Sequence, residues 1–458
     1  MDAPQDTVDN YAAAEKIYPR EVSGHFARLR RAAAWLLLGF FYSIPWLQWS
    51  ERQALLFDVP RRKFHVFSLT LWPQDFIYLS LLLIIAALAL FFFTALAGRL
   101  WCGFACPQTV WTEVYLALER FAEGNRSQRM KLDAAAWSGS KFARKAFKQF
   151  LWITFSLWTG FTFVGFFTPI RELAGEVAHG TLGGWETFWI LFYGAATYGN
   201  AGYLREQVCN YFCPYARFQS AMFDRTTMII TYDAQRGEPR GARKKGTDPR
   251  AVGLGDCVDC SICVQACPTG IDIRKGLQYE CIACAACIDA CDSVMDKIGY
   301  PKRLIRYATQ NAMDGRPTRV LRPRVLVYGA ILCLLSAGMV VSLALRKPLA
   351  LDVIHDRNAL YRLLDSGDAE NVYLLKVMNK TESAQRFRVG VAGTGALRVD
   401  PETEFVQVPA GEVLSAPLRV RRKAWEITGA SDISISITSV AEPRLTTTTR
   451  ARFFSPDR

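Results

Sequence analysis

Histidine is scarce in this sequence of 458 residues. There are only four histidines: His25, His65, His179 and His355. None lies within a long apolar run, so a haem ligated by two membrane histidines is excluded on this chain. His65 and His179 fall in loops, where a lone histidine is usually solvated. A ligand role for either of them is therefore the less favoured interpretation.

The last part of the sequence lacks cysteine. All 13 cysteines except Cys333 lie between positions 102 and 291, and residues 334–458 contain none. A tail stabilised by disulfide bonds is thereby excluded. The concentration of cysteine in one part of the chain indicates metal ligation instead.

Acidic residues are fewer than basic ones, 42 against 55, and the formal net charge is +13. Such an excess fits either nucleic-acid binding or the cytoplasmic loops of a membrane protein. Long apolar runs decide for the membrane, because a hydrocarbon core of about 30 Å needs about 20 mostly apolar residues to cross it. No nucleic-acid partner is expected.

Five apolar stretches reach the required length. They are residues 32–50, 76–98, 150–170, 185–204 and 325–345. The first and fourth are weaker, because Pro45 interrupts the first, and Glu186 and Asn200 lie in the fourth. A buried or interfacial helix is the alternative for these two. We therefore predict a multi-domain membrane protein with an α-helical transmembrane bundle of about five helices.

The distribution of basic residues predicts the orientation of these helices. Lys and Arg are dense before the first apolar stretch and between the second and third, whereas the loop after the third holds only Arg171. Cytoplasmic loops carry the excess of basic residues. The N-terminus and residues 205–324 are thus expected in the cytoplasm, and residues 346–458 outside. The first loop, with four basic residues, fits this rule least well.

Two cysteine runs carry the strongest signal. Residues 257–268 read CVDCSICVQACP, and residues 281–292 read CIACAACIDACD. Both have the spacing Cys-x2-Cys-x2-Cys-x3-Cys, in which the fourth cysteine of each run ligates the cluster of the other run. Zinc sites use cysteine pairs and are disfavoured. The predicted [4Fe–4S] ligand sets are Cys257, Cys260, Cys263 and Cys291 for one cluster, and Cys281, Cys284, Cys287 and Cys267 for the other.

Four further cysteines follow apolar stretches. Residues 101–111 read WCGFACPQTVW, and residues 208–218 read VCNYFCPYARF. Proline fits best in the first turn of a new helix, with the cysteines in the preceding bend. The predicted topology puts both motifs on the same face of the membrane. The residues expected to meet there are Cys102, Cys106, Cys209 and Cys213.

The occupant of this four-thiol site is left open by the sequence. Four thiolates suit a third iron–sulfur cluster, Cu(I) or zinc. Redox-active cysteines without any metal are the alternative. If copper reaches the four-thiol site, Cu(II) would be reduced there and the four cysteines would be catalytic.

Residues 350–458 consist of short stretches in which apolar and polar residues alternate, separated by turn residues. This pattern is typical of a β-sandwich of about 100 residues. No catalytic constellation occurs in it. Docking to an exported partner is the expected role, and a folded cap without a partner is the alternative.

Long blocks of the sequence resemble the cytochrome c oxidase accessory proteins of the CcoG/FixG/RdxA group. The blocks are IYPREVSGHFARLRR at 17–31, WCGFACPQTVWTEVY at 101–115, VCNYFCPYARFQSAMFDRTTMIITYD at 208–233, and CDSVMDKIGYPKRLIRY at 291–307. The resemblance implies a bacterial inner-membrane protein that reduces Cu(II) to Cu(I) for assembly of a cbb-type oxidase. It also implies an immunoglobulin-like C-terminal domain.

The resemblance further implies copper ions, copper-delivery proteins and oxidase assembly proteins as partners, with a quinol or a cytoplasmic molecule as electron donor. Two alternatives remain. The twin Cys-x3-Cys-Pro elements also resemble those of quinol-linked electron conduits of the NapH and NosR types. A non-enzymatic assembly factor is the second alternative.

The predicted organisation has six parts. They are a cytoplasmic segment (1–31), a membrane domain with four transmembrane helices (32–225), a basic linker (226–250), a ferredoxin-like 2[4Fe–4S] domain (251–324), a fifth transmembrane helix (325–345) and a periplasmic immunoglobulin-like domain (350–458).

Overall fold

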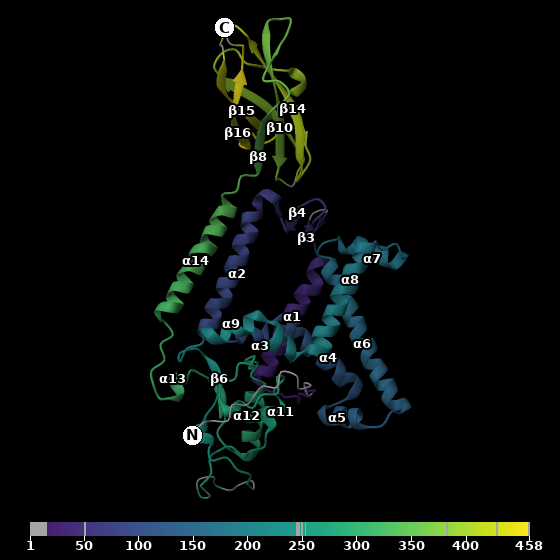
Figure 1. Cartoon of the computed structure of the whole chain (residues 1–458), viewed down its shortest axis with the longest axis vertical. Helices are drawn as coiled ribbons and strands as arrows, with labels where there is room; N and C mark the ends of the chain where they lie inside the picture. Colours follow the sequence, from purple (N-terminus) through teal and green to yellow (C-terminus); the bar gives the residue numbers. More distant parts are fainter. Residues whose placement is uncertain are drawn as a thin grey trace. The chain divides into compact units, whose positions relative to one another are not determined.

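The computed structural model describes residues 16–456, apart from 50–51, 244–247, 249–250, 252, 382 and 427–428. The chain forms two compact units. The first consists of Met1–His65 and Trp72–Ala337, and the second of Val66–Leu71 and Gly338–Arg458. Figure 1 shows the helices of the first unit and the strands of the second.

The first unit is mainly helical. Its helices are α1 (His25–Ser43), α2 (Phe76–Ala97), α3 (Leu100–Phe104), α4 (Pro107–Glu123), α5 (Arg126–Ala134), α6 (Gly139–Val164), α7 (Ile170–His179), α8 (Gly184–Thr197), α9 (Pro214–Met222), α10 (Ala234–Gly237), α11 (Ile262–Gln265), α12 (Ala286–Ile298), α13 (Gln310–Met313) and α14 (Pro323–Ala344), which continues into the second unit. The π-helical segments η3 (Tyr198–Leu204) and η4 (Val208–Phe212) follow α8. The short strands include β1 (Gln48–Trp49), β2 (Arg52–Gln53), β3 (Leu55–Asp58), β4 (Lys63–Val66), β6 (Ile229–Tyr232) and β7 (Ile305–Ala308).

Within the described part of the chain, only α2 and α14 are both long and apolar enough to cross a membrane. α2 contains no charged residue and ends at Gly98, whose φ of +57° favours glycine. α14 starts with Pro323, which suits a first helical turn. Gly329 of α14 faces Phe92 of α2, and a methyl group on it would lie 3.2 Å from the ring. These two helices suggest membrane association, and the predicted five-helix bundle is not confirmed.

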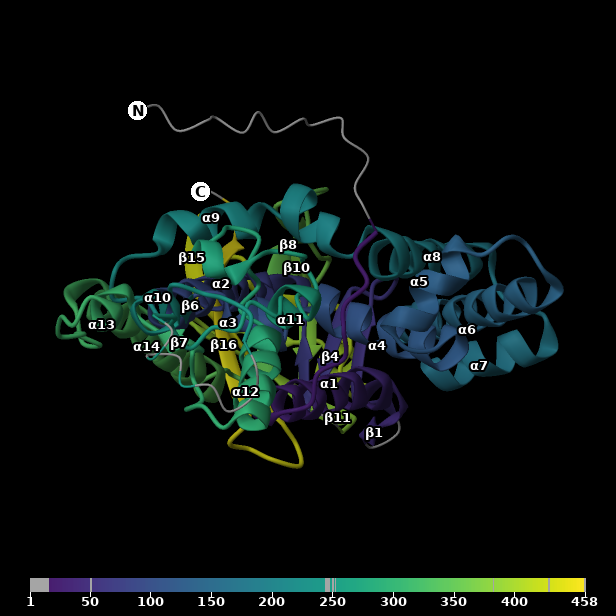
Figure 2. The same ribbon diagram turned by 90° about the horizontal axis from the view of Figure 1, so that it is seen from below.

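The other three apolar stretches differ in extent from their predicted bounds. α1 ends at Ser43 and is followed by a short 3-10 helix, Ile44–Trp46, because Pro45 cannot continue the α-helical hydrogen bonds. α6 begins at Gly139 and therefore includes Lys141 and Lys148, which lower its apolarity. The fourth stretch is divided between α8 and η3. α6 packs against α4 and α8, and Figure 2 shows these helices side by side.

The predicted ferredoxin region is closed by a pair of strands. β6 and β7 pair antiparallel, with Ile229 opposite Ala308, so they bring the two ends of the cysteine-rich segment together. A core of buried residues, among them Ile230, Ile288 and Met295, packs α12 against these strands. The cysteine loops are thus attached to a small folded body of their own.

The second unit contains two antiparallel sheets. One has the order β12-β14-β10-β8 with β9 beside β10, and the other the order β13-β11-β15-β16. The strands are β5 (Leu69–Leu71), β8 (Leu349–His355), β9 (Arg362–Leu363), β10 (Asp368–Asn379), β11 (Gln385–Gly393), β12 (Arg398–Val399), β13 (Phe405–Val408), β14 (Val413–Lys423), β15 (Ala430–Ser439) and β16 (Thr446–Phe454). Alternate residues of both sheets, such as Leu375, Val420 and Ile435, are fully buried in one shared core. The predicted β-sandwich is confirmed.

Candidate metal centres

The two cysteine runs form loops of the same shape. In each run, the residues on either side of the second cysteine have a left-handed backbone: Asp259, Ser261, Ala283 and Ala285, with φ between +51° and +59°. Such a conformation costs a non-glycine residue about 1–3 kcal/mol. Four strained residues at matching positions show that the two loops share one backbone shape.

The fourth cysteine of each run joins the other run. Cys257, Cys260, Cys263 and Cys291 line one small cavity. Cys267, Cys281, Cys284 and Cys287 line a second cavity, which Cys263 also touches. After burial, the neighbour that most raises the pKa of the Cys291 thiol is Cys263. Cys263 therefore belongs with Cys291, and the spatial groups match the two predicted ligand sets.

These two donor sets fit iron–sulfur clusters. Burial, with a smaller contribution from the neighbouring Cys267, raises the pKa of the Cys284 thiol to about 12. A thiolate at this position therefore needs a cation beside it. Four thiols around an apolar cavity are the donor set that iron–sulfur clusters prefer. Arg30 and Tyr307 hold the loop from outside by donating hydrogen bonds to the carbonyls of Cys284 and Ala283.

The two Cys-x3-Cys-Pro elements are built alike. Cys106 is the N-cap of α4 and Cys213 is the N-cap of α9, and in both cases proline is the first helical residue. This confirms the prediction that the prolines begin new helices. The chain reverses in the left-handed region at Gly98 (φ +57°) and Arg205 (φ +42°). Each of these residues lies four positions before the first cysteine of its element, which gives both elements one backbone plan.

The elements bring Cys102, Cys106, Cys209 and Cys213 into one neighbourhood. Burial, with smaller contributions from the other three thiols, raises the pKa of the Cys102 thiol to about 12. All four side chains are half-buried. As the side chains stand in the described residues, no three ligand-type groups converge on one ion position. The four-thiol site is thus present as a group of neighbours, and its occupant stays a prediction.

Each element also braces the other. Gln108, just after the first proline, donates a hydrogen bond to the Arg205 carbonyl at 3.1 Å. Tyr215, just after the second proline, shares a 2.5 Å hydrogen bond with Thr94 at the end of α2. Arg99 donates to the Ala216 carbonyl. These reciprocal contacts hold the two cysteine pairs in register.

The four-thiol site packs directly on the second cysteine run. Cys102 and Cys209 belong to one apolar cluster with the buried Cys284. Gly103 lies so close to the loop that a methyl group on it would be 2.8 Å from the Ile282 and Ala283 carbonyl oxygens. The ligand set with Cys284 is therefore the one next to the four thiols.

Arg205 is held in its strained conformation by buried partners. Its guanidinium lies 3.0 Å from Glu119, a fully buried carboxylate of α4 that also pairs with Arg129. It stacks over the Trp152 ring and donates to the Gly202 carbonyl. Burial alone would raise the pKa of Glu119, but the charges of Arg205, Lys16 and Arg129 outweigh it and lower the value.

Gln219 of α9 is the polar neighbour of the first thiol. Its side chain is fully buried, and its Oε1 lies 3.4 Å from the Cys102 Sγ. Its Nε2 lies 3.4 Å from the Thr94 hydroxyl. A buried amide beside a cysteine that ligates a metal can orient the cysteine and change the redox potential of the metal.

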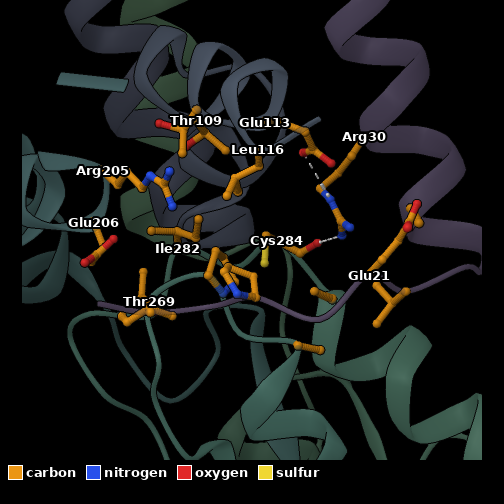
Figure 3. A pocket seen from close by; sticks show the side chains of 18 of the residues that line it. Glu21, Arg30, Thr109, Glu113, Leu116, Arg205, Glu206, Thr269, Ile282 and Cys284 are labelled. Atoms are coloured by element: carbon orange, nitrogen blue, oxygen red, sulfur yellow. Dashed lines mark hydrogen bonds and ion pairs between the residues drawn. The ribbon is translucent and has the colours of Figure 1, made fainter. Parts of the chain in front are cut away.

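A cavity of about 370 Å³ opens beside Cys209 and Cys284 (Figure 3). Its walls come from the segment before α1, from α1 and α4, from the Arg205–Cys209 turn and from the two cysteine-run loops. Figure 3 shows Arg30 reaching both the Cys284 carbonyl and Glu113. The charged residues of the lining are Arg20, Arg30, Arg31, Arg120, Arg205, Glu21, Glu113 and Glu206.

Sequence reasoning missed Gly103, Arg205, Glu119 and Gln219. Gly103 lies inside a quoted motif, so a glycine between two cysteines was an available signal for close backbone approach. The other three act through contacts far apart in sequence. His65 and His179 lie in β4 and at the end of α7, and neither lines the cavity.

Three family models match the chain. A "4Fe-4S dicluster domain" matches residues 204–310, a "4Fe-4S binding domain" matches residues 79–122, and an "IG-like fold at C-terminal of FixG" matches residues 339–456. Together with the cysteine geometry, the first two define an iron–sulfur electron-transfer protein. The third confirms the immunoglobulin-like nature of the sandwich.

Full-length relatives give the family. Protein RdxB of Cereibacter sphaeroides is 39% identical over 422 residues, which cover 88% of each chain. Protein RdxA of the same organism is 40% identical and covers 85% of this chain and 84% of its own. Nitrogen fixation protein FixG of Rhizobium meliloti is 37% identical and covers 84% and 81%. The chain belongs to the FixG/RdxA/RdxB family, as the resemblance predicted.

A solved structure is similar to part of the chain. It is the crystal structure of a FixG-related protein from Vibrio parahaemolyticus, 30% identical, covering 24% of this chain and 98% of its own, with a TM-score of 0.22.

Proposed function

We propose that this iron–sulfur protein is a membrane-bound cupric reductase, which supplies Cu(I) for assembly of a cbb-type cytochrome c oxidase. The observation that carries the proposal is the direct packing of the four-thiol site on the second cysteine run. Cys102 and Cys209 share an apolar cluster with Cys284, and Gly103 touches the loop backbone. An electron held at the second run thus lies beside four soft ligands.

In this proposal, the ferredoxin-type cysteines hold two [4Fe–4S] clusters in the two spatial groups described above. When bound, such clusters take up and release single electrons. The protein supplies buried thiolates, strained loops that aim them and the guanidinium groups of Arg30 and Arg99 that fix the loop carbonyls. The substrate step is Cu(II) plus one electron to Cu(I).

The four-thiol site gives the reduction its direction. If copper itself occupied the site, the thiolates would stabilise Cu(I) more than Cu(II) and so favour the reduced ion. The "4Fe-4S binding domain" match at 79–122 contains only Cys102 and Cys106 of the cysteines. This supports a third cluster over a copper ion as the resident of the site, and Cys102, Cys106, Cys209 and Cys213 would then hold the group that passes the electron to copper.

We also propose the predicted multi-pass topology in the bacterial inner membrane, with a cytoplasmic N-terminus and a periplasmic sandwich. It is supported by large apolar side chains that α1, α6 and α8 expose: Trp35, Leu36, Phe40, Phe150, Ile153, Leu157, Trp158, Trp185, Phe188, Trp189, Leu191 and Phe192. Such faces fit lipid better than water. A reporter that is active only outside the cytoplasm should be active when it is fused at residue 180 and when it is fused at residue 346.

The decisive experiment is anaerobic reduction of Cu(II) by purified, cluster-loaded protein, freed of excess reductant and followed with a Cu(I)-specific dye. Wild type should yield Cu(I) in proportion to its reduced clusters. Replacing Cys102, Cys106, Cys209 and Cys213 by serine should abolish the reaction while the ferredoxin-type signals remain. Continued reduction by this variant would exclude the four-thiol site as the place of reduction.

The same variant separates the alternatives. A quinol-linked conduit requires that the variant also lose oxidation of a quinol. A non-enzymatic assembly factor requires that serine at the ferredoxin-type cysteines leave oxidase maturation intact, while deletion of residues 350–458 abolishes it.

A further inference from the structure

We propose that the cavity beside Cys209 and Cys284 binds the electron donor, and that this donor is a reduced flavin nucleotide: a flat, largely apolar redox ring that carries a phosphate. The inference rests on the proposed function for the destination of the electrons. It adds the chemical class of the donor and the place where it binds.

The position of the cavity suits a donor. Cys209 of the four-thiol site and Cys284 of the second cysteine run both line the cavity, and Figure 3 shows Cys284 there. A molecule bound there lies beside both redox sites at once. The cavity volume of about 370 Å³ falls within the range of about 300–1,000 Å³ that is usual for small-molecule sites.

The charge of the lining selects an anion. Five arginines and three glutamates line the cavity. Arg30 pairs with Glu113, and Arg205 pairs with Glu119 behind the wall. For Arg20, Arg31 and Arg120, no ion pair is present with any described residue. Three guanidinium groups without an acidic partner repel a cupric ion and suit a phosphate, which arginine binds through paired hydrogen bonds.

The rest of the wall suits a ring. Leu116, Ala266, Ile282 and Ala286 are buried apolar residues of the lining, and the last three share an apolar cluster with Cys209 and Cys284. Small and branched apolar side chains form a surface on which a flat ring can pack. The ring would thus lie toward the redox sites, and the phosphate toward the arginines.

The one-electron chemistry of the acceptors restricts the chemical class of the donor further. Iron–sulfur groups accept one electron at a time. A dihydronicotinamide gives up its two electrons together as a hydride, whereas dihydroflavins and hydroquinones release them singly. The arginines then favour the phosphate-bearing dihydroflavin over a neutral hydroquinone. One reduced flavin loses two electrons and two protons, the protons pass to solvent, and two Cu(II) ions become two Cu(I) ions.

The test uses the purified, cluster-loaded full-length protein and flavin mononucleotide as the probe. Calorimetric titration should give saturable binding of one flavin per chain. The double variant Arg31→Gln, Arg120→Gln should weaken that binding about tenfold or more, since it removes two charge-assisted contacts to phosphate. Arg28→Gln is the matched control, because Arg28 is an exposed residue of α1 outside the lining. It should bind flavin as wild type does.

Riboflavin and menadiol show whether the phosphate or the ring provides the affinity of the donor for the cavity. Riboflavin lacks the phosphate and should bind wild type more weakly than the mononucleotide, with no further loss in the double variant. Equal affinity for both flavins, or displacement by menadiol at lower concentration, would overturn the assignment. Stopped-flow mixing with photoreduced flavin should then bleach the iron–sulfur absorbance of wild type, and binding without bleaching would also overturn it.

The two proposals fail separately. Protein reduced by dithionite and then desalted tests the reduction of Cu(II) without any flavin. If that reaction proceeds and no flavin binds, only the donor assignment falls. If flavin binds and bleaches the clusters while Cu(II) is not reduced, only the proposed function falls.

Discussion

Glu119 and Arg205 form a buried ion pair with a 3.0 Å contact between Oε2 and Nη2, and Arg205 is the residue at which the second cysteine element reverses its direction. The side chain of Glu119 is fully buried, and that of Arg205 is 9% exposed. An ion pair between two helical regions thus fixes the backbone that carries Cys209. The negative charge of Glu119 thereby fixes Arg205, which lies four residues before Cys209.

Glu119→Gln should destabilise the first unit by about 3–5 kcal/mol, because it leaves Arg129 and Arg205 buried without their counter-charge. Thermal unfolding in detergent, followed by tryptophan fluorescence, measures the loss. Asp58→Asn is the control, since Asp58 pairs with a largely exposed Arg61 at 3.8 Å. That change should cost less than about 1 kcal/mol. Equal losses in the two variants would contradict the role assigned to Glu119.

Gly103→Ala should separate the four-thiol site from the second cysteine run. The added methyl group would lie 2.8 Å from two carbonyl oxygens and from the Cys284 Cα. We expect copper reduction to slow on the order of 10- to 100-fold, as for other small misplacements of reacting groups, with iron content unchanged. Gly39→Ala is the matched control, because a methyl group at Gly39 in α1 meets nothing within 4 Å. A Gly103→Ala protein as fast as wild type would show that this contact does not set the rate.

Iron analysis distinguishes the occupants of the four-thiol site. Two [4Fe–4S] clusters require about eight irons per chain, and a third raises the number to about twelve. Wild type should contain about twelve, and the variant with serine at Cys102, Cys106, Cys209 and Cys213 about eight. Cys333→Ser serves as the control, because Cys333 is an exposed residue of α14 away from both sites. About eight irons in wild type would leave copper, zinc or free thiols at the site.

Gln219→Leu should lower the midpoint potential of the centre at the four-thiol site. Once Cys102 is a thiolate, rotation of the buried amide places its N–H toward the sulfur, and that hydrogen bond stabilises the reduced state. A hydrogen bond of about 1 kcal/mol corresponds to about 40 mV for one electron. Redox titration followed by EPR measures the shift, and Gln149→Leu, which alters a contact to Tyr203, is the control. An unchanged potential with unchanged iron content would exclude this role for Gln219.

The iron–sulfur role of the two cysteine runs could be predicted from their spacing alone. A tight loop can offer three thiols to a four-iron cluster, so the fourth thiol must come from the other run. The structure groups Cys291 with Cys263, and Cys267 with Cys284, as that argument requires. The β-sandwich could also be predicted from the sequence, since the alternating burial along β15 follows the alternation of isoleucine with serine and aspartate in Asp432–Ile437.

The contacts between the sites could not be predicted, because they join residues far apart in sequence. Arg205 has no local reason to adopt a left-handed backbone, and its partner Glu119 lies 86 positions earlier. The bounds of α6 were missed for a similar reason. Lys148 reads as a residue that ends an apolar stretch, yet it pairs with the buried Glu123 and continues the helix.

The mutual bracing of the two Cys-x3-Cys-Pro elements has a consequence for biosynthesis. Residues of the first element and of the end of α2 form hydrogen bonds with the second: Gln108 with the Arg205 carbonyl, Thr94 with Tyr215, and Cys102 with Gln219. A ribosome that has made only the first element has therefore made half of a site with no partner for its polar groups. The group of four thiols has its polar neighbours only after residue 219 has been translated, and the loop that contacts Gly103 is translated later still. An occupant of the four thiols would thus bind only after the second element and this loop have been made.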